Sequence, residues 1–433
     1  TTLDMREVFM KKHTLISRLL IVCIILLFSS HSTASDLIKI SAFDGAADDQ
    51  FGRSVCVSDY YAIIGAPFDD DGGADSGAAY IFRRSGSAWI QHAKLTAADA
   101  AAGDHFGQSV SLSGDYAIVG AYTDDDKGAD SGSAYIFKKS GSTWIQQDKL
   151  TSSDGAAGDK FGASVAISGD FAVVGAGEHN NNLSDTGAAY VFQRSGTDWT
   201  QQEKLTPDDT AAGDRFGLSV SISGDYIIVG APFSNPAGLD AGAAYVFVRS
   251  GSTWSQQSKL TADDAAANDF FGASVSISGN LALIGAYGDD DNGSSSGAAY
   301  IFNRSESSWT HLKKLIPTDG AQNDFFGFSV SISDTSAIVG AFADDDRGSS
   351  SGSAYTFKNP EGTWIQDEKL TADDGTVDDF FGISVSTNSS CAIMGTTGCD
   401  DLGSGSGSAY LFQFSIPKNR TSASWLPLLL SID

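Results

Sequence analysis

The sequence predicts an all-β fold, a seven-bladed β-propeller of four-stranded antiparallel blades that is closed by an N-terminal strand. Three observations lead to this prediction. The dipeptide Phe-Gly recurs at a constant interval of 55 residues, with its phenylalanines at positions 51, 106, 161, 216, 271, 326 and 381. Each unit holds four short strand-like runs separated by Gly-rich or Asp-rich turns, and no later stretch carries a convincing helical period. Evenly spaced four-stranded units repeated in this way are typical of propellers.

The four runs of one unit illustrate the prediction. Phe106–Ser113 alternates small or polar residues with apolar ones, and Asp115–Tyr122 is apolar almost throughout. Ser133–Lys138 is a short apolar run, and Thr143–Leu150 carries Gln, Lys and Asp between apolar ends. We expect the second run to be sandwiched between neighbouring blades and the fourth to form the outer rim. Gly120, in the second run, is expected where the blades crowd together.

The N-terminal strand predicts how the ring closes. A tryptophan marks the fourth strand of the first six units, at positions 89, 144, 199, 254, 309 and 364, and unit seven has Asn419 there instead. The segment Leu37–Ser41 stands upstream of the first Phe-Gly at the spacing of a fourth strand. We therefore expect it to complete blade seven by pairing with Ala409–Phe412. Closure by the tail segment Trp425–Leu430 is the alternative.

The first 34 residues are distinct from the repeats. A basic start at Met10-Lys11-Lys12 precedes the ten-residue apolar run Leu19–Phe28 and the small residues Ser32-Thr33-Ala34. Ten apolar residues are too few to span a bilayer, which favours a secretory signal peptide over the alternative of a membrane anchor. Residues 1–34 are thus interpreted as leader and signal. A secreted, periplasmic or cell-surface protein follows, with no transmembrane segment in the mature chain.

Length and charge bound the remaining possibilities. The 433 residues would suggest two or three domains, but the repeat assigns 35–415 to one propeller and leaves 416–433 as a tail. The net charge of −27 and the pI of about 4.3 argue against a nucleic-acid partner and favour cations or cationic groups. The mature chain retains Cys56, Cys391 and Cys399, an odd number that does not indicate a disulfide framework. We expect a monomer with small, semi-buried thiols.

The repeated strings resemble a known family. Phe-Gly followed by "SVSLSGDYAIVGAY" and "GSAYIF" is similar to the FG-GAP repeat of integrin α-subunit propellers and of secreted bacterial repeat proteins. The literal pattern occurs in unit one, with Gly65-Ala66-Pro67, and in unit four, with Gly230-Ala231-Pro232. The resemblance covers about residues 37–412 and implies a propeller. Integrin-like repeats carry a calcium loop between the first two strands; here that connection is only Ser113–Tyr116, so the family's calcium site does not carry over.

The charged turns are expected to separate onto two faces. Successive turns of an antiparallel meander alternate between its two ends, so turns 1–2 and 3–4 share one face, and turns 2–3 and 4–1 share the other. The turns between strands three and four carry the basic residues Arg83, Arg84, Lys138, Lys139, Arg194, Arg249, Arg304 and Lys358. Aspartates crowd the other two kinds of turn. The sequence therefore predicts one strongly acidic and one mildly basic face.

Aspartate triplets between strands two and three are the candidate metal ligands. They are Asp69, Asp70 and Asp71, then Asp124, Asp125 and Asp126, then Asp289, Asp290 and Asp291, and finally Asp344, Asp345 and Asp346. One interpretation is Ca²⁺ binding, since this ion prefers carboxylate and carbonyl oxygens. The other is a solvated turn whose carboxylates cap backbone N–H groups. Units three and four lack the triplet, and unit seven has Cys399-Asp400-Asp401.

A further aspartate stands two residues before every repeat phenylalanine. It occupies positions Asp49, Asp104, Asp159, Asp214, Asp269, Asp324 and Asp379. We interpret it as an Asx-type cap of the turn that enters strand one. Gly or Asn usually precedes it, which favours a backbone with positive φ.

The sequence favours a binding protein over an enzyme. His13 and His31 belong to the signal segment, His92 and His311 fall on rim strands, and no nucleophile–base signature or phosphate-binding glycine loop is present. His105 and His179 reach the acidic face, but on different blades. We expect a secreted or cell-surface binding or adhesion module that takes a protein or carbohydrate ligand at its acidic face. The alternatives are a hydrolase or lyase that uses this face and a passive structural domain.

Overall fold

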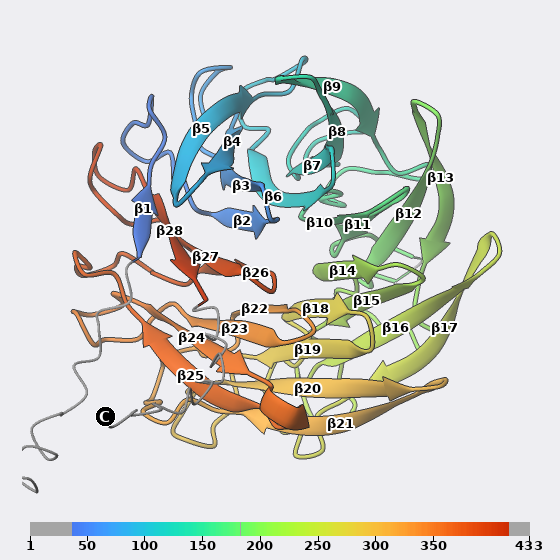
Figure 1. The fold of residues 1–433 in the computed structure, drawn as a ribbon. Coiled ribbons are helices and arrows are strands. Elements are labelled where there is room, and N and C mark those ends of the chain that lie inside the picture. Colours follow the sequence, from blue (N-terminus) through green and yellow to red (C-terminus); the bar gives the residue numbers. More distant parts are fainter. Residues whose placement is uncertain (1–36, 182, 415–433) are drawn as a thin grey trace, which may run out of the picture. The chain divides into compact units, whose positions relative to one another are not determined.

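A computed structural model of the chain describes residues 37–181 and 183–414. They form seven four-stranded antiparallel sheets in a ring (Figure 1), which confirms the predicted propeller. Among these residues the only helical element is the 3-10 turn η1 (Pro360–Gly362). The expected leader and signal peptide, Asn419 and the Trp425–Leu430 segment lie outside the described residues.

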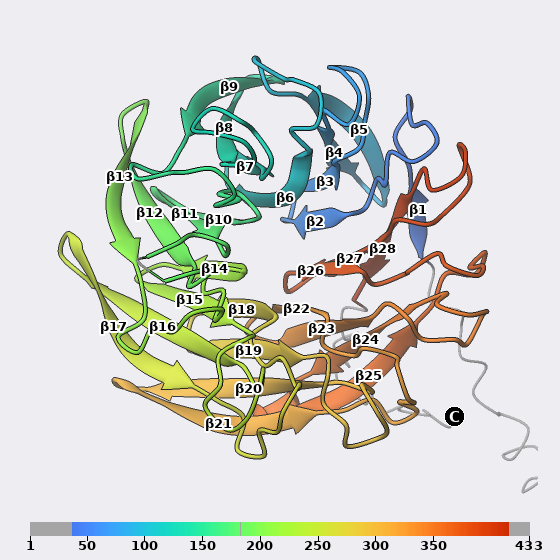
Figure 2. The ribbon, with the colours of Figure 1, turned by 180° about the vertical axis from the view of Figure 1, so that it is seen from behind.

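In the first six blades the strands follow chain order from the centre outward, as Figure 1 shows and the reverse view of Figure 2 repeats. Blades one to three consist of β2 (Ser54–Val57), β3 (Tyr61–Ala66), β4 (Ala78–Ser85) and β5 (Ala88–Leu95); β6 (Phe106–Ser113), β7 (Tyr116–Ala121), β8 (Ser133–Ser140) and β9 (Thr143–Leu150); and β10 (Ser164–Ser168), β11 (Phe171–Ala176), β12 (Ala188–Ser195) and β13 (Asp198–Leu205). Blades four to six consist of β14 (Ser219–Ser223), β15 (Tyr226–Ala231), β16 (Ala243–Ser250) and β17 (Thr253–Leu260); β18 (Ser274–Ser278), β19 (Leu281–Ala286), β20 (Ala298–Ser305) and β21 (Ser308–Leu315); and β22 (Ser329–Ile332), β23 (Ser336–Ala341), β24 (Ser353–Lys358) and β25 (Ile365–Leu370). Blade seven consists of β26 (Ser384–Thr387), β27 (Cys391–Thr396), β28 (Ser408–Gln413) and, as its outer strand, β1 (Ile38–Ile40).

The N-terminal strand closes the ring. β1 pairs antiparallel with β28, and Ile38, Lys39 and Ile40 face Leu411, Tyr410 and Ala409 in turn. The predicted pairing of Leu37–Ser41 with this strand is therefore confirmed. Because the first and last strands of the propeller share one sheet, that sheet joins the two ends of the ring.

The repeated phenylalanine packs between neighbouring blades. Phe106 is fully buried, in one hydrophobic cluster with Ala79 and Ile81 of blade one and with Tyr135 and Phe137 of its own blade. Its ring centroid lies 5.4 Å from that of Tyr135 in an edge-on arrangement. Each unit therefore buries one aromatic ring per blade interface, a contact that stabilises the fold by about 2 kcal/mol.

The glycine of the second strand marks the closest approach of two blades, as predicted. A Cβ atom on Gly120 would lie 2.0 Å from the carbonyl oxygen of Gly162 in the next blade. A side chain at this position would force the blades apart. The innermost strands are also joined directly, since the Ile167 amide donates to Ser111 Oγ of the preceding blade at 3.2 Å.

The tryptophans of the outer strands pack on the preceding blade. Trp144 lies edge-on to Tyr61, with ring centroids 5.7 Å apart. Blade seven lacks this tryptophan within the described residues, and the equivalent of Tyr61 in blade six is the buried Ser336, whose hydroxyl donates to the carbonyl of Asn388. The same position holds Leu281 in blade five and Cys391 in blade seven, so an aromatic partner is present only in blades one to four.

Candidate functional site

The two kinds of turn separate as the alternation predicts. The Lys139 amide, between strands three and four, donates to the carbonyl of Asp115, between strands one and two, at 2.8 Å. At the opposite end, the Gly103 amide, between strand four and the next strand one, donates to the carbonyl of Ala74, between strands two and three, at 2.9 Å. We call the end formed by turns 2–3 and 4–1 the acidic face.

The other face is closer to neutral than the sequence predicts. Its basic side chains are present, but aspartates of the turns between strands one and two pair with them. Arg194 binds Asp170 and Arg249 binds Asp225. Lys139 Nζ lies 3.7 Å from Asp115 Oδ1. These three partly exposed pairs offset part of the positive charge, and each contributes only about 0.2 to 1 kcal/mol to stability.

On the acidic face, each aspartate of a triplet has a different role. In blade two the first, Asp124, is buried, and its Oδ1 accepts the amide of Asp126 at 3.1 Å. Its Oδ2 accepts the hydroxyl of Tyr135 at 2.8 Å. The second, Asp125, is exposed and accepts the amide of Asp130 at 2.8 Å. The triplet therefore includes the backbone-capping bonds of the solvated-turn interpretation, together with a buried anion that this interpretation did not include.

A lysine ammonium occupies the point on which three carboxylates converge. Lys149 Nζ lies 2.9 Å from Asp124 Oδ2, 2.6 Å from Asp126 Oδ2 and 2.8 Å from Asp99 Oδ2. Burial alone would lower the pKa of Lys149, but the hydrogen bonds to the three carboxylates raise it above its ordinary value. Burial would raise the pKa of Asp124, yet the bonds from Lys149 and Tyr135 hold it below its ordinary value. Both groups are therefore charged at neutral pH.

The same cluster recurs in the three other blades that carry a triplet. The central lysines are Lys94 in blade one, Lys314 in blade five and Lys369 in blade six, each 2.8 Å from the buried first aspartate. Each also binds the third aspartate of its triplet and one aspartate of the preceding turn 4–1, which are Asp71 and Asp44, Asp291 and Asp264, and Asp346 and Asp319. We call each of these clusters a lysine cage.

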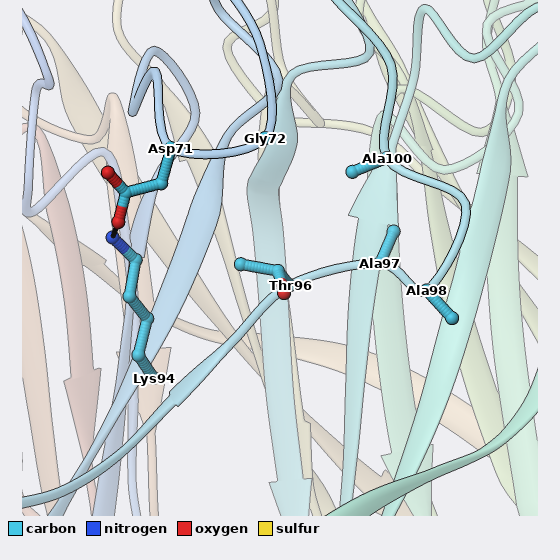
Figure 3. A pocket seen from close by; sticks show the side chains of 7 residues that line it. All are labelled: Asp71, Gly72, Lys94, Thr96, Ala97, Ala98 and Ala100. Atoms are coloured by element: carbon cyan, nitrogen blue, oxygen red, sulfur yellow. Dashed lines mark hydrogen bonds and ion pairs between the residues drawn. The ribbon is translucent and has the colours of Figure 1, made fainter.

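The cavity beside the lysine cage of blade one has Asp71 and Lys94 as its only charged lining residues. In blade one a cavity of about 410 Å³ is lined by Asp71, Gly72, Lys94 and Thr96 with three alanines. Figure 3 shows the Lys94 ammonium directed at the Asp71 carboxylate, with the alanine methyl groups on the other side of the opening. The charged groups of this cavity are thus already engaged with each other.

Calcium binding by the triplets stays a prediction, and the geometry limits how it could occur. The carboxylates of Asp99, Asp124 and Asp126 do converge within 4.8 Å of one another, as do those of Asp264, Asp289 and Asp291. However, the oxygens that a calcium ion would need are the ones that accept hydrogen bonds from the lysine. An ion could bind only if it displaced the ammonium, since two cations cannot share the position.

Blades three and four vary the cage. In blade three His179 stands where Asp124 stands in blade two. Its Nδ1 lies 2.8 Å from Asp159 Oδ2 and its Nε2 lies 2.8 Å from Lys204 Nζ. In blade four Ser234 takes that place, and Lys259 pairs with Asp209. The lysine thus remains although the triplet is absent.

The aspartate before each repeat phenylalanine is structural, as predicted. All seven are buried, and their Oδ2 atoms accept the amide three residues earlier at 2.6 to 2.9 Å. The residue ahead of each has positive φ, as the sequence suggests: Asp48, Gly103, Gly158, Gly213, Asn268, Asn323 and Asp378. Burial raises the pKa of Asp49, Asp269 and Asp324 to about 6, despite the bond from the amide. The neighbouring triplet carboxylates add to this increase.

The histidines form no complete acid–base constellation in the part of the chain that the structure describes. His105 Nδ1 lies 2.6 Å from Thr123 Oγ1, and burial lowers the pKa of His105. No carboxylate bonds to its other ring nitrogen among the described residues. His179 is engaged on both sides, and His311, on a rim strand, pairs with Asp263. These contacts are those of structural side chains.

The sequence indicates the aspartates of the acidic face but not the lysines and tyrosines that bind them. The lysines stand in a Lys-Leu pair at the end of the outer strands of blades one to six, and in Lys39-Ile40 in blade seven. The tyrosines stand in an Ala-Tyr pair on each third strand, so both features repeat with the unit. This recurrence is the feature of the sequence that could have indicated the lysines and tyrosines as partners of the aspartates. The distances along the chain, 25 residues from Lys149 to Asp124 and 50 to Asp99, concealed the contact.

The repeating blades, each with its buried Phe-Gly and its lysine, define a propeller built from one unit used seven times. That unit matches the family model of the FG-GAP repeat over residues 35–82, 89–137, 144–192, 199–247, 254–302, 309–357 and 364–412. The chain belongs to the FG-GAP repeat family, as the resemblance implied. Each match begins on the outer strand of one blade and ends on the third strand of the next, so the first match includes β1. A comparison with the curated proteins found no match.

Proposed function

We propose that this propeller is an extracellular binding or adhesion module whose acidic face engages a ligand that carries cationic groups. One observation carries the proposal. The carboxylates in excess of the lysines gather on this face, whereas several basic groups of the opposite face, among them Arg194 and Arg249, pair with aspartates beside them. Charges of one sign on one surface attract a complementary ligand from a distance and raise the rate of association.

Family membership supports the extracellular setting, since FG-GAP repeats are typical of extracellular proteins. No helix among the described residues is long and apolar enough to cross a membrane. The secretory signal peptide remains part of the proposal. We also propose that the domain is not an enzyme, because its histidines engage structural partners and its carboxylates repeat from blade to blade.

The exposed second aspartates of the triplets provide the test. Asp70, Asp125, Asp290 and Asp345 are changed together to asparagine, which keeps an oxygen to accept the loop amide and removes the charge. The matched control removes four exposed charges from the opposite face, at Asp59, Asp115, Asp170 and Asp225. The probe is a fluorescent octalysine peptide, measured by polarisation at several salt concentrations.

We expect binding to the acidic-face variant to be about tenfold weaker, with a shallower salt dependence, and binding to the control to be close to wild type. Equal losses in the two variants would show that only total charge matters. In that case, or if the peptide does not bind at all, the passive structural domain is the better interpretation.

A further inference from the structure

Three cysteines lie in the described part of the chain, and all are free, as expected from their odd number. Cys56 is half-buried on the innermost strand of blade one, and Cys391 is buried on β27. Burial raises the pKa of both thiols, which makes them poor nucleophiles. The third, Cys399, is also buried, but it lies on the acidic face between β27 and β28.

Cys399 takes the place of a buried carboxylate. The equivalent positions in the four cage-bearing blades are Asp69, Asp124, Asp289 and Asp344, each 3 to 4% exposed. Each of these aspartates receives at least three donors: a lysine ammonium, a tyrosine hydroxyl and the amide two residues later. The position is therefore built to hold an anion with two oxygens.

Blade seven keeps the groups that would donate to such an anion. Lys39 Nζ lies 3.2 Å from Cys399 Sγ and also binds Asp374 and Asp401. The hydroxyl of Tyr410, which corresponds to the tyrosine of the other cages, donates to Asp374 Oδ1 at 2.6 Å. A thiol accepts hydrogen bonds only weakly, so in its reduced form Cys399 serves these donors poorly.

We propose that Cys399 is a modification site at which a peroxide oxidises the thiol to a sulfinate that replaces the missing carboxylate. In the first step sulfur attacks one peroxide oxygen; an S–O bond forms, the O–O bond breaks, and sulfenic acid and water result. A second peroxide repeats the step and yields sulfinic acid and a second water. Sulfur is oxidised, both peroxides are reduced, and the acidic proton passes to solvent, which leaves two oxygens on sulfur where aspartate has two on carbon.

The modification would strengthen closure of the ring. Lys39 lies on β1, which is the outer strand of blade seven but comes from the other end of the chain. In the other six blades the central lysine lies on an outer strand that directly follows the third strand of the same blade. A sulfinate at Cys399 gives Lys39 a third charge-assisted bond, next to those of Asp374 and Asp401, and offers an acceptor to Tyr410. The N-terminal strand is then held to the last blade as firmly as the outer strands of the cage-bearing blades are held to theirs.

The experiment treats the purified full-length chain with stepwise hydrogen peroxide, stops the reaction with catalase, and locates oxygen by peptide mass spectrometry. We expect a gain of about 32 Da on the Cys399 peptide before the Cys56 or Cys391 peptide gains oxygen. The melting temperature should rise by about 2 °C in step with this product. Oxidation of Cys56 or Cys391 first, or a product at Cys399 that stops at one oxygen, would overturn the proposal.

Two substitutions test the geometry without an oxidant. Cys399→Asp supplies the carboxylate directly and should melt about 2 °C above Cys399→Ser, which supplies neither sulfur nor charge. Peroxide should leave the melting temperature of both variants unchanged. A Cys399→Asp variant no more stable than Cys399→Ser would mean that the site is not built for an anion, and the proposal would then be wrong. If a variant folds poorly, the mass measurement on the wild-type chain still tests whether Cys399 is oxidised to a sulfinate.

Discussion

The aspartate triplets are best understood residue by residue. In blade two Asp124 is a buried anion, Asp125 holds its own loop, and Asp126 reaches the same lysine as Asp124. Three adjacent like charges are tolerated because the ammonium of Lys149 lies between Asp124 and Asp126 and because Asp125 bonds to its own loop instead. The lysine takes the role that a metal ion has in many acidic loops.

Replacing this lysine should create a calcium dependence. Lys149→Met leaves Asp99, Asp124 and Asp126 without a counter-charge, and we expect a loss of about 3 kcal/mol because a partly buried ion pair is broken. Calcium should then restore up to about 2.7 kcal/mol at a hundredfold excess over its Kd. Thermal unfolding with and without calcium measures both effects.

Two controls accompany this experiment. Lys259→Met in blade four should show no rescue, because Ser234 and Pro236 replace two of the three carboxylates. The wild-type chain should respond to calcium no more than to sodium chloride at matched ionic strength. A larger calcium response of the wild type would favour the calcium site that the sequence suggests, with the lysine displaced.

Gly120 provides a second test at the scale of one residue. Gly120→Ala brings a methyl group against the backbone of Gly162, so we expect a loss of about 3 kcal/mol through separation of two blades. The matched control is Gly141→Ala, where φ is +61° and no atom lies within 4 Å of the new Cβ. That change should cost only about 1 kcal/mol, from its backbone conformation. Similar melting temperatures for the two variants would contradict the close approach.

At the scale of the element, the outer strands are what the sequence describes least completely. Each outer strand of blades one to six carries a register shift against its neighbour, which in blade two falls between Ile136 and Phe137. Such a bulge increases the local twist and makes an edge less able to pair with another molecule. No residue type in the repeat signals the bulge, because the extra residue, Gln147 in blade two, is an ordinary strand residue.

The contribution of β1 to closure of the ring can be tested by deletion. Deleting residues 37–41 bares the edge of β28 and removes buried Ile40, and we expect a loss of several kcal/mol at about 25 cal/mol per Å² of apolar area. Thermal unfolding and light scattering should report a lower melting temperature and some aggregation. The rival closure by the tail makes the opposite forecast: deletion of residues 416–433 would then be the more damaging change.

At the scale of the whole molecule, the buried aspartates of the acidic face should make the stability of the fold depend on pH. Asp49, Asp269 and Asp324 have pKa values of about 6 in the fold, and those of Asp104, Asp214 and Asp379 are also raised. The unfolded value is about 3.9, so between pH 6 and 4 the folded state binds more protons. Stability should therefore rise as pH falls through this window. It should be lost below about pH 4, where the carboxylates paired with lysine become protonated.

A variant separates this effect from general repulsion. Changing Asp49, Asp269 and Asp324 to asparagine keeps an acceptor for the turn amides and removes the groups that titrate near pH 6. The rise in melting temperature between pH 7 and pH 5 should become smaller than in wild type. An unchanged slope would assign the pH dependence to net charge instead.

The sequence by itself determined the number of blades, the four strands of each, the separation of turns onto two faces and the closing strand. These follow from a fixed period and from alternation along the chain, which are local properties. Only the tertiary structure decided which carboxylate meets which ammonium, because Asp124 and Lys149 meet when the strands of blade two pair, and Asp99 joins them from the connection between blades one and two. It also decided that arginines of the opposite face pair with aspartates and that Cys399 stands in an anion's place, since both depend on how turns distant in the chain meet in space.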